Sequence, residues 1–443
     1  MSTLTISIVI VFIVGYAFIA LESFTKVNKA AVALLMFAVC WALFMISPES
    51  YVQAPMGGTV LDAVNTSLEG HLGSTSTTLF FLLGAMTIVE IIDQNGGFNF
   101  VRRALRSESK RALLWKITIL TFFLSAILDN MTTTIVMVTV TNKLVADKRD
   151  RLYYASLVVI AANAGGAFSP IGDVTTIMLW NKNCITSSGV ITEIFFPSLI
   201  AVLVPALILQ YHLSGKLKIA DSAILSDSPQ ELSETQRKAV FVLGIGGLIF
   251  VPIFRYITDL PPFVGILLVL AVLWTTTEIF YAHKHHADGM TKRVSVLLSN
   301  IDMSTILFFL GILMAVACLE DIGVLHSFGR GLNNVFEGNH YLVTGIIGVL
   351  SSIVDNVPLV GGCMGMYQIA PTGDFATDGL FWQLLAYCAG VGGSMLIIGS
   401  AAGVVAMGIE KITFTWYLKN VTWIAFVGYI AGEAFYYLQN LVL

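Results

Sequence analysis

Long apolar runs separated by short polar stretches recur along the chain from Leu4 to Leu443. Runs of about 20 apolar residues are typical of helices that cross a bilayer, because an unpaired backbone group in hydrocarbon is very costly. The pattern predicts ten spans, at residues 4–22, 30–46, 77–93, 152–180, 194–213, 238–257, 262–281, 301–320, 380–408 and 415–438. We therefore expect an all-α polytopic membrane protein.

Composition agrees with a lipid environment. The 443 residues are 56% hydrophobic and only 12% charged, about half the charged share of a soluble domain. A formal net charge of −4 gives no reason to expect a nucleic-acid partner. The bilayer itself is thus the expected surrounding.

Two further apolar stretches, 112–142 and 341–367, are each interrupted by an Asp-Asn pair. If both are re-entrant hairpins and the amino terminus is outside, 21 of the 24 Lys and Arg residues lie on the cytoplasmic side. The exceptions are Lys182, Arg255 and Arg330. A single span through 112–142 would instead divide the basic clusters between the two faces. The charges therefore favour two hairpins and place both termini outside.

The chain also contains an internal repeat. A shift of 227 residues aligns residues 81–84 with 308–311 and the pair 165–166 with 392–393, and a shift of 226 aligns 125–130 with 351–356. We expect a first repeat at 1–213 (hairpin 112–142, interrupted helix 152–180), a cytoplasmic linker at 214–237, and a second repeat at 238–443 (hairpin 341–367, interrupted helix 380–408). Each repeat has five spans, an odd number, so the second is inverted relative to the first. Inverted repeats with broken helices are typical of secondary transporters.

Oxygen-bearing side chains gather at the two hairpin tips and the two helix interruptions. Such side chains, with the open backbone of a broken helix, suit a small hard cation. The predicted cation and proton ligands are Asp129, Asn130, Thr132, Ser169, Asp173, Thr175, Ser351, Asp355, Asn356, Ser394 and Ser400. The residues expected to keep the backbone open are Gly165, Gly166, Pro170, Pro358, Gly392 and Gly393.

Three carboxylates dominate this predicted site. Asp129, Asp173 and Asp355 lie in segments that contain no Lys or Arg, so the charge balance favours a bound cation, Na⁺, shared by the three. Clustered carboxylates resist full ionisation, so sodium and protons should compete for them. An aspartate at each tip could instead only cap the following helix, but a matched pair of costly intramembrane acids suggests a shared function.

Other polar groups offer weaker signals. Glu90 and Glu433 lie within spans and could belong to a separate proton path, whereas Asp93 and Glu320 lie at span ends where water can solvate them. The cluster His283-Lys-His285-His286 could sense pH or simply be solvated. A Walker A motif, a CxxC pair and an HExxH motif are all missing from the sequence, so we expect neither an enzyme nor a cofactor.

The segments around Asp129-Asn130, Ser169-Pro-Ile-Gly-Asp173-Val-Thr-Thr and Asp355-Asn-Val-Pro358 together resemble the NhaD-type sodium/proton antiporters of the ion transporter superfamily. The resemblance covers nearly the whole chain. It implies a homodimer in a bacterial inner membrane, with a scaffold part and a mobile, elevator-type transport part that carries both hairpins. It also implies export of Na⁺ or Li⁺ against entry of H⁺.

Two other functions stay open at this point. A sodium-coupled dicarboxylate symporter would share the superfamily, but its dianion would meet three carboxylates at close range. Those carriers also keep Ser-Asn-Thr at the tips, where this chain has Asp129 and Asp355. An intramembrane aspartyl protease would also need two acids, although it carries Tyr-Asp and Gly-x-Gly-Asp motifs instead of Asp-Asn pairs.

Overall fold

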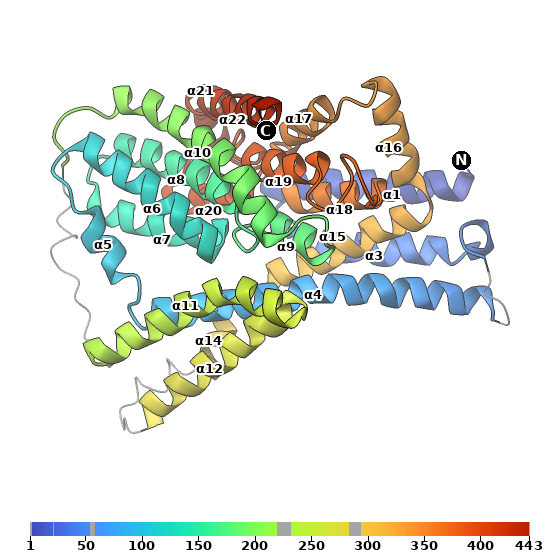
Figure 1. Ribbon diagram of the computed structural model, residues 1–443, viewed down its shortest axis with the longest axis horizontal. Helices are drawn as coiled ribbons and strands as arrows, with labels where there is room; N and C mark the ends of the chain where they lie inside the picture. The colour runs from blue at the N-terminus through green and yellow to red at the C-terminus, as the bar shows by residue number, and fades with distance from the viewer. Residues whose placement is uncertain (1, 21, 54–57, 219–231, 283–293, 443) are drawn as a thin grey trace.

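The computed structural model describes residues 2–20, 22–53, 58–218, 232–282 and 294–442, and these are almost entirely helical (Figure 1). The first half comprises α1 (Thr3–Ala20), α2 (Glu22–Thr25), α3 (Lys29–Phe44), η1 (Pro48–Ser50), α4 (Val60–Gln94), α5 (Asn99–Leu105), α6 (Lys110–Leu128), α7 (Asn130–Leu144), α8 (Lys148–Ala167), α9 (Val174–Asn181) and α10 (Ser187–His212). The second comprises α11 (Glu234–Thr258), α12 (Pro262–Ala282), α14 (Val294–Leu297), η3 (Leu298–Asn300), α15 (Met303–Asp321), α16 (Val324–Val335), α17 (His340–Ser351), α18 (Asn356–Met366), α19 (Leu380–Gly392), α20 (Ala401–Glu410), α21 (Phe414–Asn420) and α22 (Thr422–Val442). Six of these helices are long and apolar enough to cross a membrane, or seven if α21 and α22 count as one.

Both interrupted stretches form helical hairpins, as the sequence predicts. The first hairpin, α6 and α7, begins and ends beside one segment: Lys110 N donates to Gly215 O at 3.1 Å, and Ala146 N donates to Lys218 O at 2.9 Å. The chain therefore leaves the first hairpin on the side from which it entered. The second hairpin, α17 and α18, approaches from the opposite end of the molecule (Figure 1).

Packing between the halves follows an approximate two-fold exchange. α3 packs on α15 and α12 packs on α4, so each half supplies a helix that covers a long helix of the other. In the same way α7 packs on α20 and α18 packs on α9, while α10 and α22 pack on each other. These reciprocal contacts confirm two inverted repeats as the fold class.

Glycines allow each hairpin to lie directly against the broken helix of its own repeat. A β carbon at Gly165 in α8 would lie 2.1 Å from the carbonyl oxygen of Phe122 in α6, and one at Gly392 in α19 would lie 2.2 Å from that of Gly348 in α17. Phe122 and Gly348 are themselves related by the 226-residue shift. The backbones touch, so these positions exclude any side chain.

We expect Gly165→Ala to destabilise the protein by about 3 kcal/mol or more, because the methyl group can fit only if α6 and α8 separate. Heating the purified protein in detergent and measuring the folded fraction by size exclusion checks this. Gly246→Ala, on α11 where a β carbon meets nothing within 4 Å, is the matched control and should be neutral or slightly stabilising. An unchanged melting temperature for Gly165→Ala would contradict the close packing.

Two predicted spans were wrong in extent. Instead of 77–93, α4 covers 35 residues from Val60, because Thr59 and Asp62 form a capping box and the polar first half of the helix faces α15. The predicted span 415–438 is bent by 54° between α21 and α22. The first difference arises because polar residues at the start of α4 lower its hydropathy without ending the helix.

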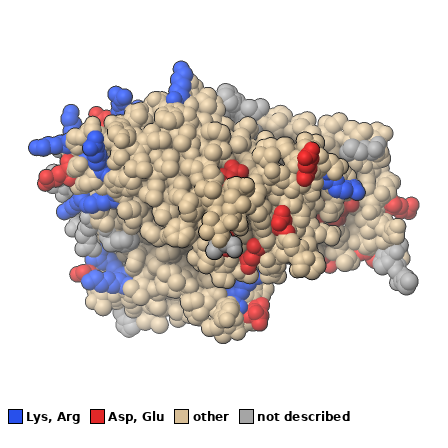
Figure 2. Space-filling view, turned by 45° about the horizontal axis from the view of Figure 1, so that its top comes forward, with Lys and Arg blue, Asp and Glu red and all other residues tan. Residues whose placement is uncertain are grey.

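Charge is distributed unevenly along the long axis. Figure 2 shows Lys and Arg side chains gathered at the left end, where α5 and the start of α11 lie in Figure 1. At the other end of α11, Arg255 donates to Trp180 O at 2.9 Å and to Asn183 Oδ1 at 2.6 Å. Arg255 and Lys182, two of the three basic residues predicted outside, therefore lie close together at the end of α11 opposite the basic cluster.

Candidate functional site

Asp173 lies where the two repeats meet. It caps α9, and its Oδ1 accepts hydrogen bonds from the backbone N of Thr175 at 3.0 Å and from the Thr175 hydroxyl at 3.1 Å. Its side chain also accepts from Asn130 Nδ2 at 2.7 Å and from Asn356 Nδ2 at 3.3 Å. Asn130 begins α7 and Asn356 begins α18, so the tips of both hairpins bind one carboxylate. Asp173 is 1% exposed.

The repeat partner of Asp173 makes a different contact. Ser400 caps α20 and accepts a hydrogen bond from Asn163 Nδ2 at 2.9 Å. Asn163 Oδ1 in turn accepts from Asn130 at 3.1 Å. The two broken helices are therefore joined through side chains, but only the first has a carboxylate, as the sequence predicts.

Asp129 and Asp355 occupy the hairpin tips, each as the cap of the second helix. Asp129 accepts from the Thr132 backbone N at 2.7 Å and the Thr132 hydroxyl at 2.8 Å, and has φ = 92°, a conformation unusual for a residue with a side chain. Asp355 accepts from Val357 N at 3.3 Å.

The remaining predicted ligands mostly connect segments through backbone carbonyls. Their hydroxyls donate at 2.5–2.7 Å: Ser169 to Ala126 O, Ser351 to Ala389 O and Ser394 to Val391 O. Pro170 lies in the break after α8. Pro358 lies in the first turn of α18, where an N–H group would have no hydrogen-bond partner within the helix, so proline is tolerated there. Gly166 and Gly393 each face the loop of their own broken helix, at Gly172 and Gly399.

The three aspartates do not form a single cluster in this conformation. Among the described residues, no group of three His, Cys, Asp or Glu side chains comes close enough to share a metal ion. The structure instead brings together Asp173, Asn130 and Asn356, with Asp129 and Asp355 on the two flanks. Binding of one Na⁺ by all three carboxylates stays a prediction.

One of the 21 basic residues predicted on the cytoplasmic side reaches this site. Lys29 Nζ lies 3.6 Å from Asp355 Oδ2. The four broken segments contain no Lys or Arg, so inspecting them alone could not reveal this partner; the signal was only that Lys29 directly precedes an apolar run.

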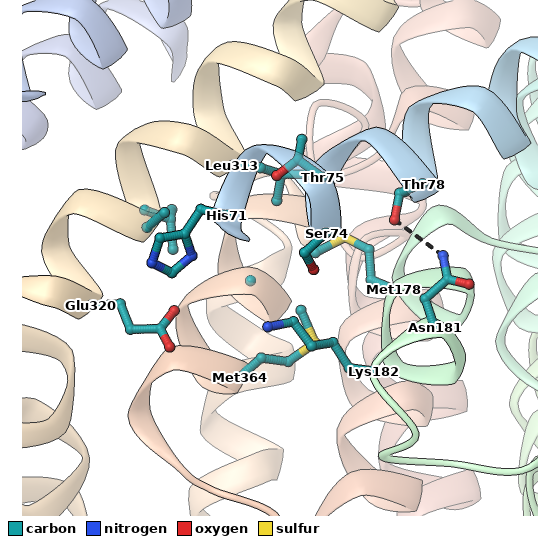
Figure 3. Close-up of a pocket in the computed structure, with 13 residues that line it drawn as sticks. His71, Ser74, Thr75, Thr78, Met178, Asn181, Lys182, Leu313, Glu320 and Met364 are labelled. Carbon is teal, nitrogen blue, oxygen red and sulfur yellow. Dashed lines mark hydrogen bonds between the residues drawn. The ribbon is translucent and has the colours of Figure 1, made fainter. Parts of the chain in front are cut away.

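An open pocket of about 520 Å³, open solvent included, with both polar and apolar side chains in its walls, lies beside the site (Figure 3). Its walls come from α4, the end of α9, α15 and α18: His71, Ser74, Thr75, Thr78, Met178, Asn181, Lys182, Leu313, Val316, Ala317, Glu320, Gly361 and Met364. It contains none of the predicted ligands. However, α9 and α18 are the helices capped by Asp173 and Asp355, so the pocket follows them away from the site toward the end where Lys182 lies.

Polar contacts order the walls of the pocket. Asn181 Nδ2 donates to Thr78 Oγ1 at 3.2 Å, a bond that joins α9 to α4 (Figure 3). Asp321, at the end of α15, accepts from Ser67 at 2.5 Å and lies 3.0 Å from His71 Nε2. Sequence analysis missed Ser67 and His71, although their spacing places them on one face of a helix.

The weaker sequence candidates have separate locations. Glu90 accepts from Asn300 Nδ2 at 3.0 Å, and Glu433 is half-buried on α22, facing Gly345 of α17. Neither touches Asp173. The cluster His283 to His286 lies outside the described residues, as does most of the predicted linker 214–237.

Two inverted repeats with broken helices that meet at a buried polar site define a secondary transporter. The model of the citrate transporter family, CitMHS, matches residues 16–384. Sodium/proton antiporter 1 of Arabidopsis thaliana is 43% identical over 97% of this chain and 72% of its own length. The Na⁺/H⁺ antiporter NhaD of Vibrio cholerae is 29% identical over 99% of this chain and 92% of its own.

The fold also has a solved counterpart. The YdaH transporter of Alcanivorax borkumensis superposes with a TM-score of 0.61 at 12% identity, over 91% of this chain and 97% of that one. The chain belongs to the citrate transporter family and, within it, to the NhaD-type sodium/proton antiporters. It is a membrane transporter and not an enzyme.

Proposed function

We propose that this protein exchanges sodium, or lithium, for protons by an elevator-type movement, with Asp173 at the centre of the ion site. The observation that carries the proposal is the junction at Asp173, where amides from both hairpin tips meet one buried carboxylate. The names of its antiporter relatives support sodium and protons as the transported ions.

The chemistry of the junction explains exchange. Among the described residues no Lys or Arg lies within ion-pair distance of Asp173, so the carboxylate can be neutralised by a proton or by a small cation. Each neutral form excludes the other ligand. If only neutralised forms cross the membrane readily, sodium and protons must move in opposite directions.

The packing suggests which parts move. The two hairpins, the broken helices α8–α9 and α19–α20, and the helices α10 and α22 form one connected group around Asp173. α1, α3, α4, α11, α12 and α15 pack mainly on one another and form the proposed scaffold. The pocket beside Lys182 lies on the boundary between the two groups, where sliding would open or close a path.

The asymmetric charge supports an orientation. We assign the basic end in Figure 2 to the cytoplasm, which places the amino terminus outside. A homodimer in a bacterial inner membrane remains part of the proposal, based on the resemblance to NhaD-type antiporters.

The proposal can be tested in proteoliposomes that contain the purified protein and a trapped pH dye. Adding Na⁺ or Li⁺ on one side should move protons the other way, and K⁺ should not. If sodium moves no protons but a sodium gradient drives citrate or succinate uptake, the protein is a dicarboxylate symporter and the proposal is wrong.

Elevator movement predicts that the hairpin tip changes sides. In an Ile127→Cys variant, an impermeant thiol reagent should label the cysteine from one membrane face without sodium and from the other face with sodium, because the tip moves relative to the scaffold. Ile127 is half-buried, and all five native cysteines are buried. Ser299→Cys, at an exposed position in η3, should be labelled from one face under both conditions. Labelling of Ile127→Cys that ignores sodium would count against this movement.

A further inference from the structure

Lys29 is held in a defined position beside the second hairpin. It is the first residue of α3, and its backbone N donates to Glu22 Oε1 at 3.1 Å. Its ammonium lies 4.3 Å from the centroid of the Phe308 ring and 3.6 Å from Asp355 Oδ2. The side chains of Lys29 and Asp355 are 24% and 18% exposed. An aromatic face and a carboxylate together hold this cation in place.

The two partners belong to different groups of helices. α3 packs on α1 and α15, within the proposed scaffold, whereas Asp355 caps α18 of the second hairpin. The ion pair therefore joins the scaffold to the part proposed to move.

The two hairpin tips differ in the donors that their aspartates receive. Asp129 receives two hydrogen bonds from Thr132, three residues further on. The residue at the same distance from Asp355 is Pro358, which has neither an N–H nor a hydroxyl to donate. α12, the counterpart of α3, contains no Lys, Arg or His, so it presents no cation to Asp129. Lys29 thus replaces, for Asp355, the donors that Thr132 provides to Asp129.

We propose that Lys29 is a built-in competitor for sodium: its ammonium binds Asp355 when the site is empty, and Na⁺ must displace it to bind there. This inference rests on the proposed sodium exchange. The competition lowers sodium affinity and favours release, because the carboxylate that loses Na⁺ regains a cationic partner at once. It also fixes the empty hairpin against the scaffold.

Neutral substitutions test the competition. Lys29→Gln and Lys29→Met should lower the sodium Km in proteoliposomes, and the sodium Kd of the purified protein, by about fivefold, the effect expected of a partly exposed ion pair. Lys29→Arg should stay near the wild-type values. Lys26→Gln removes a charge from an exposed position on the same connection and should change neither constant.

Chemical rescue separates competition from damage to the fold. In Lys29→Cys, aminoethyl methanethiosulfonate restores an amine of nearly lysine length, and sodium affinity should return to the wild-type value in the same protein sample. Wild-type protein treated in the same way is the control, because its five cysteines are buried. Since only folded protein gives the before-and-after difference, this experiment holds even if Lys29→Gln is unstable.

The outcomes are distinct. Wild-type sodium affinity in both neutral variants, or weaker binding that aminoethylation leaves unchanged, would overturn the role of Lys29. If wild-type protein itself shows no sodium-dependent proton movement, the proposed function fails instead.

Discussion

Asp173→Asn should reduce sodium-proton exchange at least about a hundredfold while the protein stays folded. One hydrogen bond to an ionised group is worth about 1.5–3 kcal/mol, and each 1.4 kcal/mol corresponds to a factor of ten in rate or binding. Loss of the charge removes more than one such interaction, so the expected reduction is at least about a hundredfold. Asparagine caps a helix as well as aspartate does, so α9 should persist. Initial rates of sodium-driven proton movement, per folded protein, measure the loss.

Asp147→Asn is the matched control for this experiment. Asp147 also caps a helix, α8, through backbone N–H groups, but it is exposed at the basic end. Exchange at the wild-type rate is expected there.

Asp129→Asn and Asp355→Asn should also abolish exchange without preventing membrane insertion. Full activity in either would mean that the aspartate only caps its helix, a role that the structure shows for all three.

The apparent Km for sodium should rise as pH falls, by up to about tenfold per pH unit when one proton competes. The sign follows from shared occupancy: a protonated carboxylate has no charge for Na⁺, so more sodium is needed to displace the proton at low pH. The maximal rate at saturating sodium should change less. Sodium titrations between about pH 6 and about pH 9, with the same pH on both sides of the membrane, measure this dependence.

A different pH profile would locate the proton elsewhere. If the sodium Km is constant across that range and activity falls only through the maximal rate, protons do not share the sodium site. Glu90 and Glu433 would then be the next residues to change. Of the two substitutions, Glu433→Gln is the more direct test of a separate proton path, since Glu433 lies half-buried within α22.

Sequence alone could predict the hairpins because two independent signals agree there. The Asp129-Asn130 and Asp355-Asn356 pairs interrupt apolar runs, and the distribution of Lys and Arg requires both runs to return to the side of entry. The repeat then fixed which segments correspond. Hydrogen bonds from Asn130 and Asn356 to a common Asp173 were not predictable, because matched segments need not meet at one atom.

The Lys29 contact was missed for a related reason. The positive-inside rule reports on which side of the membrane a basic residue lies, but not how deep it lies. The sequence places Lys29 in the connection before the span 30–46, whereas in the structure it is the first residue of α3 and its ammonium lies beside the tip of the second hairpin. The early start of α4 at Val60 was missed because its polar residues lower the hydropathy on which span prediction depends.

The short helices α1 and α3, which belong to the proposed scaffold, have a consequence for the surrounding lipid. α1 has 18 residues and α3 has 16, which at a rise of about 1.5 Å per residue correspond to lengths of about 27 and 24 Å, less than the hydrocarbon thickness of about 30 Å. Both carry exposed aliphatic side chains, such as Ile10, Ile13 and Leu35. A span this short is accommodated by local thinning of the bilayer, by flanking side chains that extend to the interface, or by packing against other helices. A change in bilayer thickness is therefore expected to act on α1 and α3, the two helices joined by the connection that ends at Lys29.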